Sequence, residues 1–370
     1  MPDEQIALPR RSQVDVSTVL QAAAADAGPA NGVPGRRGRL AQAAAWASPR
    51  RLSVVYFFAA MFVIFSVWVP ATFLTSSTWH SLLADQAITG LVAVAFSIPI
   101  AAGAFDLAIG SEVGFGGILV AWLIVPRGLP VIPAIALTLV AGGCVGLVSG
   151  LLVVRARIDA FIATLAMSSI LLALVSWISG GSQILNLPNS LQAIATNTLL
   201  GIAYPVWILL AITLVAWYVL EWTPVGRSIY ATGGNPEAAR LAGVRTSLVI
   251  VLSLIACGMI ASVAGILNTG QLGVGDPTAG PSLLLPAIAG VFLGSTQFRG
   301  GRVNVWGTVF AIYALATGTT GLQLAGAPTW ISELFDGVAL LIAVGISKYQ
   351  RRPTRRLAVI RQAVSPRRAR

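Results

Sequence analysis

The sequence predicts an all-α, polytopic membrane protein with about ten transmembrane helices. Of its 370 residues, 56% are hydrophobic and only 10% are charged, whereas an ordinary soluble domain carries about 25% charged residues. The mean hydropathy is +0.82. Because one bilayer crossing takes about 20 apolar residues, the chain is long enough for about ten crossings and their loops. So few charges cannot cover a globule of this size in water, which excludes a soluble enzyme.

Apolar runs place the spans in order along the chain. Several runs are short or interrupted by Gly and Pro, and broken or re-entrant helices are expected there, since irregular backbone is tolerated where it is buried in protein. The expected spans are residues 52–70, 86–104, 111–125, 130–153, 161–179, 205–222, 247–268, 283–296, 303–321 and 331–347.

The basic residues orient these spans. If the N-terminus is cytoplasmic and the spans alternate in direction, every Lys and Arg except Arg127 falls in a cytoplasmic segment. An odd error in the number of spans would destroy this sorting. The excess of Lys and Arg in cytoplasmic loops therefore predicts that both termini are cytoplasmic.

The charge distribution also divides the chain. Residues 1–50 are rich in Ala, Pro, Gly and Arg without an apolar core, which predicts a disordered cytoplasmic arm and not a secretory signal. Residues 51–348 form the expected transmembrane domain, with a cytoplasmic loop at 223–246, and residues 349–370 form a basic cytoplasmic tail. The basic stretches are explained by topology and the membrane surface, so no nucleic-acid partner is expected.

The side chains that usually bind metals or perform catalysis are scarce. Cys144 and Cys257 both lie in apolar runs, where Cys behaves as a small hydrophobe, and His80 is the single histidine. This composition predicts no disulfide framework, no metal site, no catalytic residue and no cofactor in the chain.

Two segments look like interrupted helices. The first is 102–117, where Asp106 and Glu112 stand among apolar and small residues, and the second is 286–307. Short Gly-interrupted segments in both halves of a transporter indicate an internal repeat around a central pathway. In the first segment the structural break is assigned to Asp106, Gly110 and Ser111, with Asp106 capping the next helix at Ser111-Glu112 or accepting loop N–H groups.

A glycine stripe predicts close helix packing within the spans. Gly142, Gly146 and Gly150 recur at four-residue spacing and therefore share one helix face. Without Cβ atoms on this face, a neighbouring helix can approach closely.

The cytoplasmic loop TPVGRSIYATGGNPEAARLAGVRTS, residues 223–247, is built as a capped helix and not as a linker. Asn235 can cap a helix, Pro236 suits its first position and Glu237 suits its first turn. Gly233 and Gly234 are expected to form a turn before it, and Gly243 to end it. A short helix of this kind, too small to span a membrane, fits docking into a groove of a partner protein.

Here a family resemblance becomes specific. Glu237-Ala238-Ala239 followed by Gly243 resembles the E-A-A-x-x-x-G coupling motif of bacterial ATP-binding-cassette (ABC) importer permeases, and GGNPEAARLAGV is similar to its version in ribose-type monosaccharide permeases. Four further blocks follow the order of that family over about residues 52–350, although Glu112 stands where the family more often has a neutral residue. These blocks are FDLAIGS (105–111), DAFIATLAM (159–167), PTAG (277–280) and AIAGVFLGST (287–296).

The resemblance implies a permease subunit in the bacterial cytoplasmic membrane, paired as a homodimer or pseudo-symmetric heterodimer. An ATPase subunit would bind ATP-Mg and the coupling helix, and an extracytoplasmic binding protein would deliver a ribose- or xylose-like monosaccharide. The chain has no G-x-x-x-x-G-K-[ST] loop, and its only lysine is Lys348, so it is not itself expected to be an ATPase. The coupling residues that the resemblance implies are Gly234, Asn235, Glu237, Ala238, Ala239, Arg240 and Gly243.

A neutral, hydroxyl-rich substrate requires hydrogen-bonding side chains on an otherwise apolar wall. Such groups follow the seventh and eighth expected spans, although they could instead satisfy broken helix ends. The candidate pathway residues are Asn268, Thr269, Gln271, Ser295, Thr296 and Gln297.

Three other functions remain open from sequence. A nucleoside or branched-chain amino acid permease would share the architecture. An ion-coupled secondary transporter could use Asp106 and Glu112 to carry ions, but this leaves the capped cytoplasmic helix unexplained. An intramembrane enzyme would need a catalytic pair that the sequence does not offer.

Overall fold

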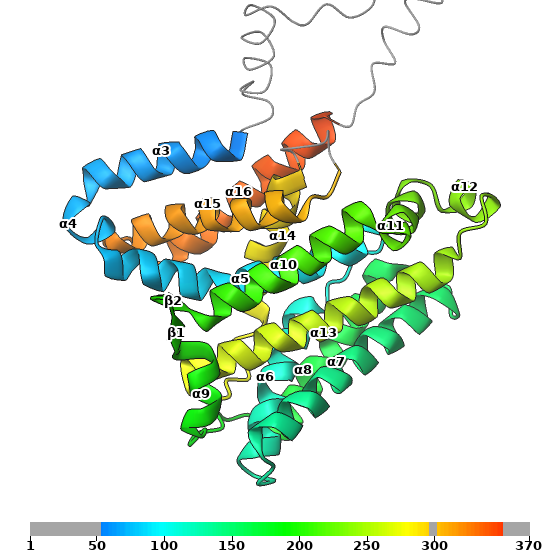
Figure 1. The fold of residues 1–370 in the computed structure, drawn as a ribbon, viewed down its shortest axis with the longest axis horizontal. Coiled ribbons are helices and arrows are strands. Elements are labelled where there is room, and N and C mark those ends of the chain that lie inside the picture. The colour runs from blue at the N-terminus through cyan, green and yellow to red at the C-terminus, as the bar shows by residue number, and fades with distance from the viewer. Residues whose placement is uncertain (1–52, 296–301, 351–370) are drawn as a thin grey trace, which may run out of the picture. The chain divides into compact units, whose positions relative to one another are not determined.

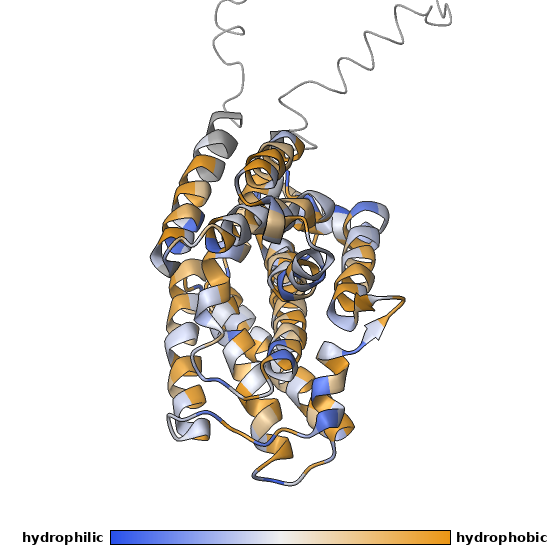
Figure 2. Cartoon of the chain, turned by 90° about the vertical axis from the view of Figure 1, so that its left-hand side faces the viewer, coloured by the Kyte–Doolittle hydropathy of each residue, from blue (hydrophilic) through white to orange (hydrophobic). Residues whose placement is uncertain are grey.

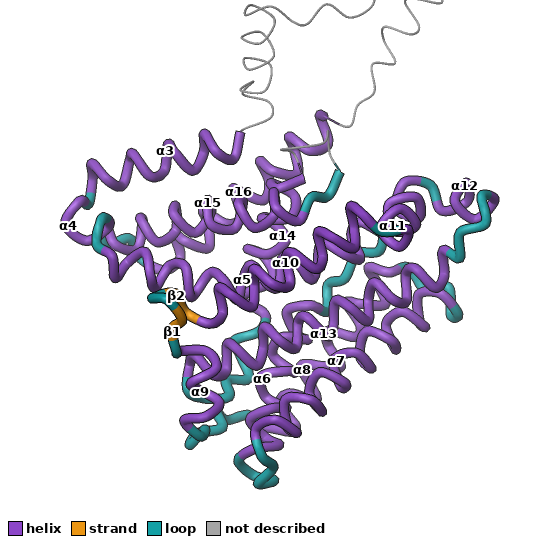
Figure 3. Tube along the Cα trace, in the orientation of Figure 1, coloured by secondary structure: helices purple, strands orange, loops and turns teal. Residues whose placement is uncertain are grey.

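The computed structural model describes residues 53–295 and 302–350. These residues are predominantly helical, with one 3-10 turn and one β-hairpin whose two strands have two residues each (Figure 3). The expected arm at 1–50, and the tail beyond residue 350, lie outside the described residues. The elements are α3 (Ser53–Trp68), α4 (Pro70–Phe73), α5 (Ser76–Ala101), α6 (Ile109–Ile124), α7 (Val131–Val154), α8 (Ala160–Ser179), α9 (Asn189–Thr196), β1 (Thr198–Leu199), β2 (Ile202–Ala203), α10 (Tyr204–Trp222), α11 (Pro224–Gly234), α12 (Pro236–Leu241), α13 (Thr246–Leu272), η1 (Pro281–Leu283), α14 (Leu284–Ser295), α15 (Val305–Leu324) and α16 (Thr329–Gln350).

Each expected span coincides with one helix of the all-α membrane fold. By length and composition, α5, α7, α8, α10, α13 and α15 can each cross a bilayer, whereas α3, α6 and α14 are shorter. The second expected span was placed too late, because α5 begins at Ser76 under a cap in which Thr75 accepts the Thr78 N–H at 3.3 Å. Polar residues in the first turns of α5 lower the local hydropathy, so this part of the helix does not stand out as an apolar run.

The helices form two groups of four, α5–α8 and α13–α16, and the first helix of each group packs mainly on helices of the other group. In the group α5–α8, helix α6 packs on α7 and α8; in the group α13–α16, helix α14 packs on α15 and α16. Helix α5, however, also packs on α14 and α15, while α13 packs on α6 and α7, and α5 and α13 pack on each other (Figure 1). Both groups therefore have the same contact pattern, and each contains one short helix, α6 or α14, preceded by a break.

The glycine stripe of α7 faces α13, as the four-residue spacing predicts. A Cβ on Gly142 would overlap the side chain of Ser262, and one on Gly146 would lie 2.7 Å from the backbone carbon of Leu254. Backbone thus packs on backbone along this contact, a geometry that only small residues permit.

The core lies along α5 and α13. Every residue of α5 from Ala87 to Pro99 is buried, as is usual for a helix enclosed by others. Helix α8 is the opposite case, because it buries one narrow face and exposes large apolar side chains such as Trp177. Hydrophobic residues also run along the outer helices (Figure 2), which is typical of a protein that has lipid as its solvent.

Candidate functional site

Helix α12 has the capped form that its sequence predicts. The Asn235 side chain accepts the Ala238 N–H at 3.0 Å, Pro236 opens the helix and Glu237 lies in its first turn. At the other end, Gly243 has a φ of +87°. The Gly243 N–H donates to the Arg240 carbonyl and the Val244 N–H to the Ala239 carbonyl, both at 3.0 Å, which is the Schellman arrangement.

The surface of α12 is almost wholly exposed. Ala239 is its one buried residue, whereas Leu241 has 87% of its surface exposed. A short helix that presents Glu237, Arg240 and an apolar Leu241 outward has the character of a docking element. It lies beside α11 at the end of α10, remote from the hairpin and α9 (Figure 1).

Helix α11, before it, corrects one expectation. Gly233 and Gly234 do not form a free turn but complete α11, whose first turn is capped by the Thr223 hydroxyl accepting the Gly226 N–H at 3.3 Å. Most of the expected loop is therefore two helices at an angle. Local turn signals in the glycine pair were outweighed by packing of the helix end against the rest of the fold.

That packing joins α11 to the break between α5 and α6. A Cβ on Gly233 would lie 3.0 Å from both the Ala101 carbonyl carbon and the Gly103 backbone nitrogen. Gly103 itself has a φ of +84°, the left-handed region that favours glycine. The end of α11 thus rests on the backbone at the point where α5 stops.

The same helix also contacts the segment before α15. The Tyr230 hydroxyl donates to the Val303 carbonyl at 2.8 Å, and the guanidinium carbon of Arg302 lies 3.5 Å from the centre of the Tyr230 ring. Helix α11 therefore contacts both the break before α6 and the segment before α15. A displacement of α11 would act directly on both of these segments.

The first break is held by hydrogen bonds from its own carboxylate and from α8. Asp106 Oδ1 accepts the Ala108 N–H at 3.0 Å, so Asp106 binds a loop N–H and does not cap the helix at Ser111-Glu112. Thr164 of α8 accepts the Leu107 N–H at 3.0 Å and donates to the Phe105 carbonyl at 3.2 Å.

The other two break residues join α6 to its neighbours. The hydroxyls of Ser111 and Ser168 lie 2.6 Å apart, and a Cβ on Gly110 would lie 3.2 Å from the Gly280 carbonyl oxygen. Gly110 therefore allows the close approach of the segment before α14. Of the three residues assigned to the break from sequence, Asp106 thus contacts a loop N–H, Ser111 contacts α8 and Gly110 contacts the segment before α14.

The candidate pathway residues have different surroundings. Asn268, Thr269 and Gln271 lie in the last two turns of α13, which continues to Leu272. Thr269 is buried, whereas the Gln271 amide donates to the Asp85 carboxylate of α5. Ser295 ends α14 with its hydroxyl bound to the Phe292 carbonyl at 2.8 Å, and Thr296 and Gln297 lie outside the described residues.

Sequence reasoning missed Asp85, although the residue carries a visible signal. It is an acid next to the apolar part of α5, and an acid inside a helix that can span a membrane usually marks a functional or paired group. The expected second span begins at residue 86, so Asp85 falls just outside it. The Asp85–Gln271 pair links α5 to α13 at the ends remote from α11.

A polar loop follows α13 at this same end. The Ile184 and Gly275 backbones form an isolated antiparallel bridge at 2.9 Å, and Gln183 donates to Asp276 at 3.0 Å. Asp276 also accepts the N–H and hydroxyl of Thr278, and these hydrogen bonds hold the pKa of its carboxyl below the usual value. Asp276 thus remains charged and orders the loop that leads to η1.

Comparison with known proteins identifies relatives across most of the chain. Residues 79–344 match the model of a family described as "Branched-chain amino acid transport system / permease component". The ribose import permease protein RbsC of Escherichia coli (strain K12) is 34% identical over 277 residues, 74% of this chain and 86% of its own length. The L-arabinose ABC transporter permease protein AraH of Azospirillum brasilense is 30% identical over 86% of this chain and 94% of its own length.

A third relative imports another sugar. The fructose import permease protein FrcC of Rhizobium meliloti is 30% identical over 78% of this chain and 83% of its own length. No solved structure matches the chain.

Proposed function

We propose that this chain, which belongs to the family of permease components of branched-chain amino acid transport systems, is the transmembrane subunit of an ABC importer for a monosaccharide. The observation that carries the proposal is the placement of α11 and α12. An exposed, capped helix stands at one end of the bundle, and the helix before it contacts the break before α6 and the segment before α15. Through this arrangement, a movement of a partner docked on α12 can be transmitted by α11 to the membrane domain.

The energy for transport comes from another subunit. The chain has no phosphate-binding loop of the Walker type, so ATP-Mg belongs to an ATPase subunit that receives α12. Two permease chains, as a homodimer or a pseudo-symmetric heterodimer, enclose the pathway, and an extracytoplasmic binding protein supplies the sugar. The complex resides in the bacterial cytoplasmic membrane with both permease termini in the cytoplasm.

The substrate class follows from the relatives and from the polar groups. The family description names branched-chain amino acids, but the relatives described above import ribose, L-arabinose and fructose. A branched-chain amino acid or nucleoside remains the second candidate. An ion-coupled transporter is less consistent with the structure, because it gives no role to the exposed helix α12.

Docking of α12 predicts a strong effect at Leu241. Leu241→Asp removes an apolar contact from the interface and places a charge there, while the free subunit loses nothing because the side chain is 87% exposed. Burying a leucine stabilises a contact by about 1.5–3 kcal/mol, so we expect at least a tenfold loss of uptake and loss of the ATPase subunit during co-purification.

Leu200 provides a matched control for this test. It is 86% exposed in the hairpin between β1 and β2, so Leu200→Asp introduces the same charge at a comparable position. The ATPase subunit is expected to co-purify normally with this variant. Equal retention of the ATPase subunit by both variants would contradict the docking role of α12.

The topology predicts opposite accessibility for the two ends of the bundle. In a chain with Cys144 and Cys257 replaced by Ser, we expect an impermeant maleimide to label Ala242→Cys only in inside-out vesicles. Ser182→Cys, an exposed residue near Gln183, is expected to react only in intact spheroplasts. The reverse pattern would overturn the orientation of the subunit.

The pathway residues are tested by comparing side-chain classes. Asn268→Ala and Gln271→Ala are expected to lower uptake severalfold at equal protein level, since each removes hydrogen-bonding groups that a sugar requires. Asp106→Asn serves as the comparison, because its carboxylate holds the break. Normal uptake in the first two variants, with loss only in Asp106→Asn, would move the pathway to residues 105–112.

A further inference from the structure

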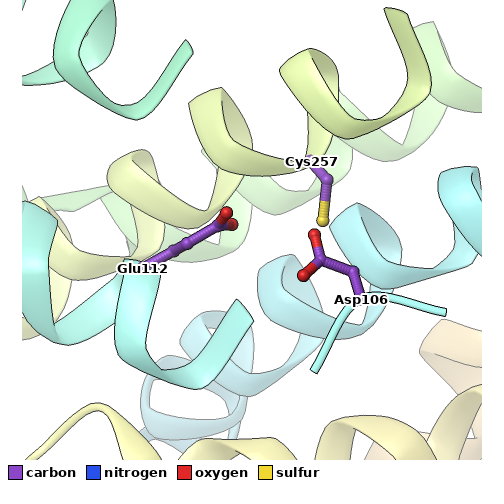
Figure 4. A group of neighbouring side chains, drawn as sticks. All are labelled: Asp106, Glu112 and Cys257. Atoms are coloured by element: carbon purple, nitrogen blue, oxygen red, sulfur yellow. The ribbon is translucent and has the colours of Figure 1, made fainter. Parts of the chain in front are cut away.

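Three side chains from distant parts of the sequence converge inside the bundle. Asp106 lies in the break before α6, Glu112 in the first turn of α6 and Cys257 in the middle of α13. One ligand atom from each lies within 4.8 Å of the others. The Glu112 carboxylate points across a short gap at the Asp106 carboxylate and the Cys257 thiol (Figure 4).

Three of the four carboxylate oxygens in this cluster are buried without a hydrogen-bond partner among the described residues. Asp106 and Cys257 have none of their surface exposed, and Glu112 has 1% exposed. Asp106 Oδ1 accepts the Ala108 N–H, but Asp106 Oδ2 and both carboxylate oxygens of Glu112 have no hydrogen-bond partner among the described residues. Buried oxygens in this state are costly, and in native structures they usually indicate a missing partner such as an ion or water.

The surrounding helices supply no positive charge. The sequences of α5, α6, α7, α8 and α13 contain no Lys or Arg. A buried carboxylate without a cation is strongly unfavourable in a medium of low dielectric constant. No side chain of these helices neutralises the two carboxylates, so either a proton or a bound cation must do so.

We propose that Asp106, Glu112 and Cys257 form a buried binding site for a divalent cation of the zinc class. Two carboxylates neutralise such an ion, and the thiol adds a donor that zinc and its softer relatives favour. The donor set does not suit Mg²⁺ or Ca²⁺, which take six or more oxygen ligands. A proton shared by the two carboxyl groups is the competing occupant, and the infrared measurement described below distinguishes it from a metal ion.

The geometry is close to what zinc requires. Bond lengths near 2.0–2.3 Å place neighbouring ligand atoms of a tetrahedral ion about 3.5 Å apart. The observed spread of up to 4.8 Å closes to this value through rotation of the Glu112 side chain, which no hydrogen bond holds. The fourth position is left for water.

A bound ion would connect parts that otherwise only pack together. It ties the break before α6 to α13, across the contact between the two four-helix groups. The break begins after Ala101, and Gly233 of α11 packs against the backbone of Ala101 and Gly103 at this point. The ion therefore stabilises the segment against which the coupling helices act.

The experiment uses the full-length chain, expressed with zinc in the medium and purified in detergent. We expect elemental analysis to find one zinc per chain. After removal of zinc, Cd²⁺ is the probe, because a cadmium–thiolate bond gives a charge-transfer band in the ultraviolet. We expect this band to saturate at one Cd²⁺ per chain.

Cys144 provides the matched control, since it is the other cysteine and is exposed. Cys144→Ala is expected to retain the band, whereas Cys257→Ala loses it and Glu112→Gln weakens Cd²⁺ binding at least tenfold. Zn²⁺ is also expected to raise the thermal unfolding midpoint of the wild type and of Cys144→Ala, because a ligand that binds the folded state stabilises it.

Three results would overturn the proposal. One is the absence of both a cadmium band and thermal stabilisation by Zn²⁺ in the wild type. Another is a band that persists in Cys257→Ala, and the third is an infrared signal of a protonated carboxyl group that Zn²⁺ does not change and Glu112→Gln removes. In that last case, the cluster holds a proton and not a metal. The wild-type measurements decide the question even if Cys257→Ala fails to fold.

Discussion

Gly233→Val is expected to abolish sugar uptake while the permease still inserts and binds its ATPase subunit. A Cβ at this position overlaps the Ala101 carbonyl and lies 3.0 Å from the Gly103 nitrogen. Both atoms belong to the backbone at the end of α5, so they cannot move aside as a flexible side chain would. Helix α11 must therefore shift away from the break, and the exposed surface of α12 is left unchanged.

The measurement is uptake in proteoliposomes together with ATP hydrolysis by the assembled complex. We expect hydrolysis to continue and uptake to fall by more than tenfold. Ala231→Leu is the control, because Ala231 is an exposed residue of the same helix and the change adds at least as much volume. Equal uptake by Gly233→Val and the wild type would show that the contact between α11 and the break does not transmit movement.

The elements that were predicted from sequence depend on local signals. Apolar runs gave the positions of the long helices, and Asn235, Pro236 and Gly243 gave both ends of α12. These signals depend on hydrogen bonds and conformations within a few residues. Where local and tertiary effects disagree, as at the Gly233-Gly234 pair, the prediction was wrong because packing of α11 on the α5 end decides the conformation.

The candidate site depends on contacts between residues far apart in the sequence, which local sequence patterns do not predict. Cys257 was interpreted as a small hydrophobe because its neighbours in sequence are apolar, yet α13 packs on α6 and brings its thiol to Asp106 and Glu112. The contact of Tyr230 with Val303 likewise joins segments far apart in the chain. Such pairs depend on which helices become neighbours, and a single sequence does not specify that choice.

Gly146→Ala is expected to be among the most destabilising single-methyl changes in the spanning helices. The new Cβ would overlap the Leu254 carbonyl oxygen and lie 2.8 Å from the Ile255 Cα, so helices α7 and α13 would have to separate. Overpacking of this kind costs about 1–3 kcal/mol and occasionally more. The loss extends to the neighbouring contacts of Gly142 and Gly150 on the same stripe, which depend on the same helix separation.

The neighbouring Gly143 provides a matched control for the destabilisation expected in Gly146→Ala. Its Cβ would lie 3.3 Å from Cγ of Met259, the flexible part of a side chain that can rotate away. Replacing a helical glycine by alanine otherwise favours the helix by about 1 kcal/mol, so Gly143→Ala is expected to leave the unfolding midpoint unchanged or raise it. Thermal unfolding of both variants in detergent, monitored by the retention of a monodisperse peak, compares them directly. Equal midpoints for the two variants would contradict the close approach of α7 to α13, because then the same added methyl group meets no more resistance at Gly146 than at Gly143.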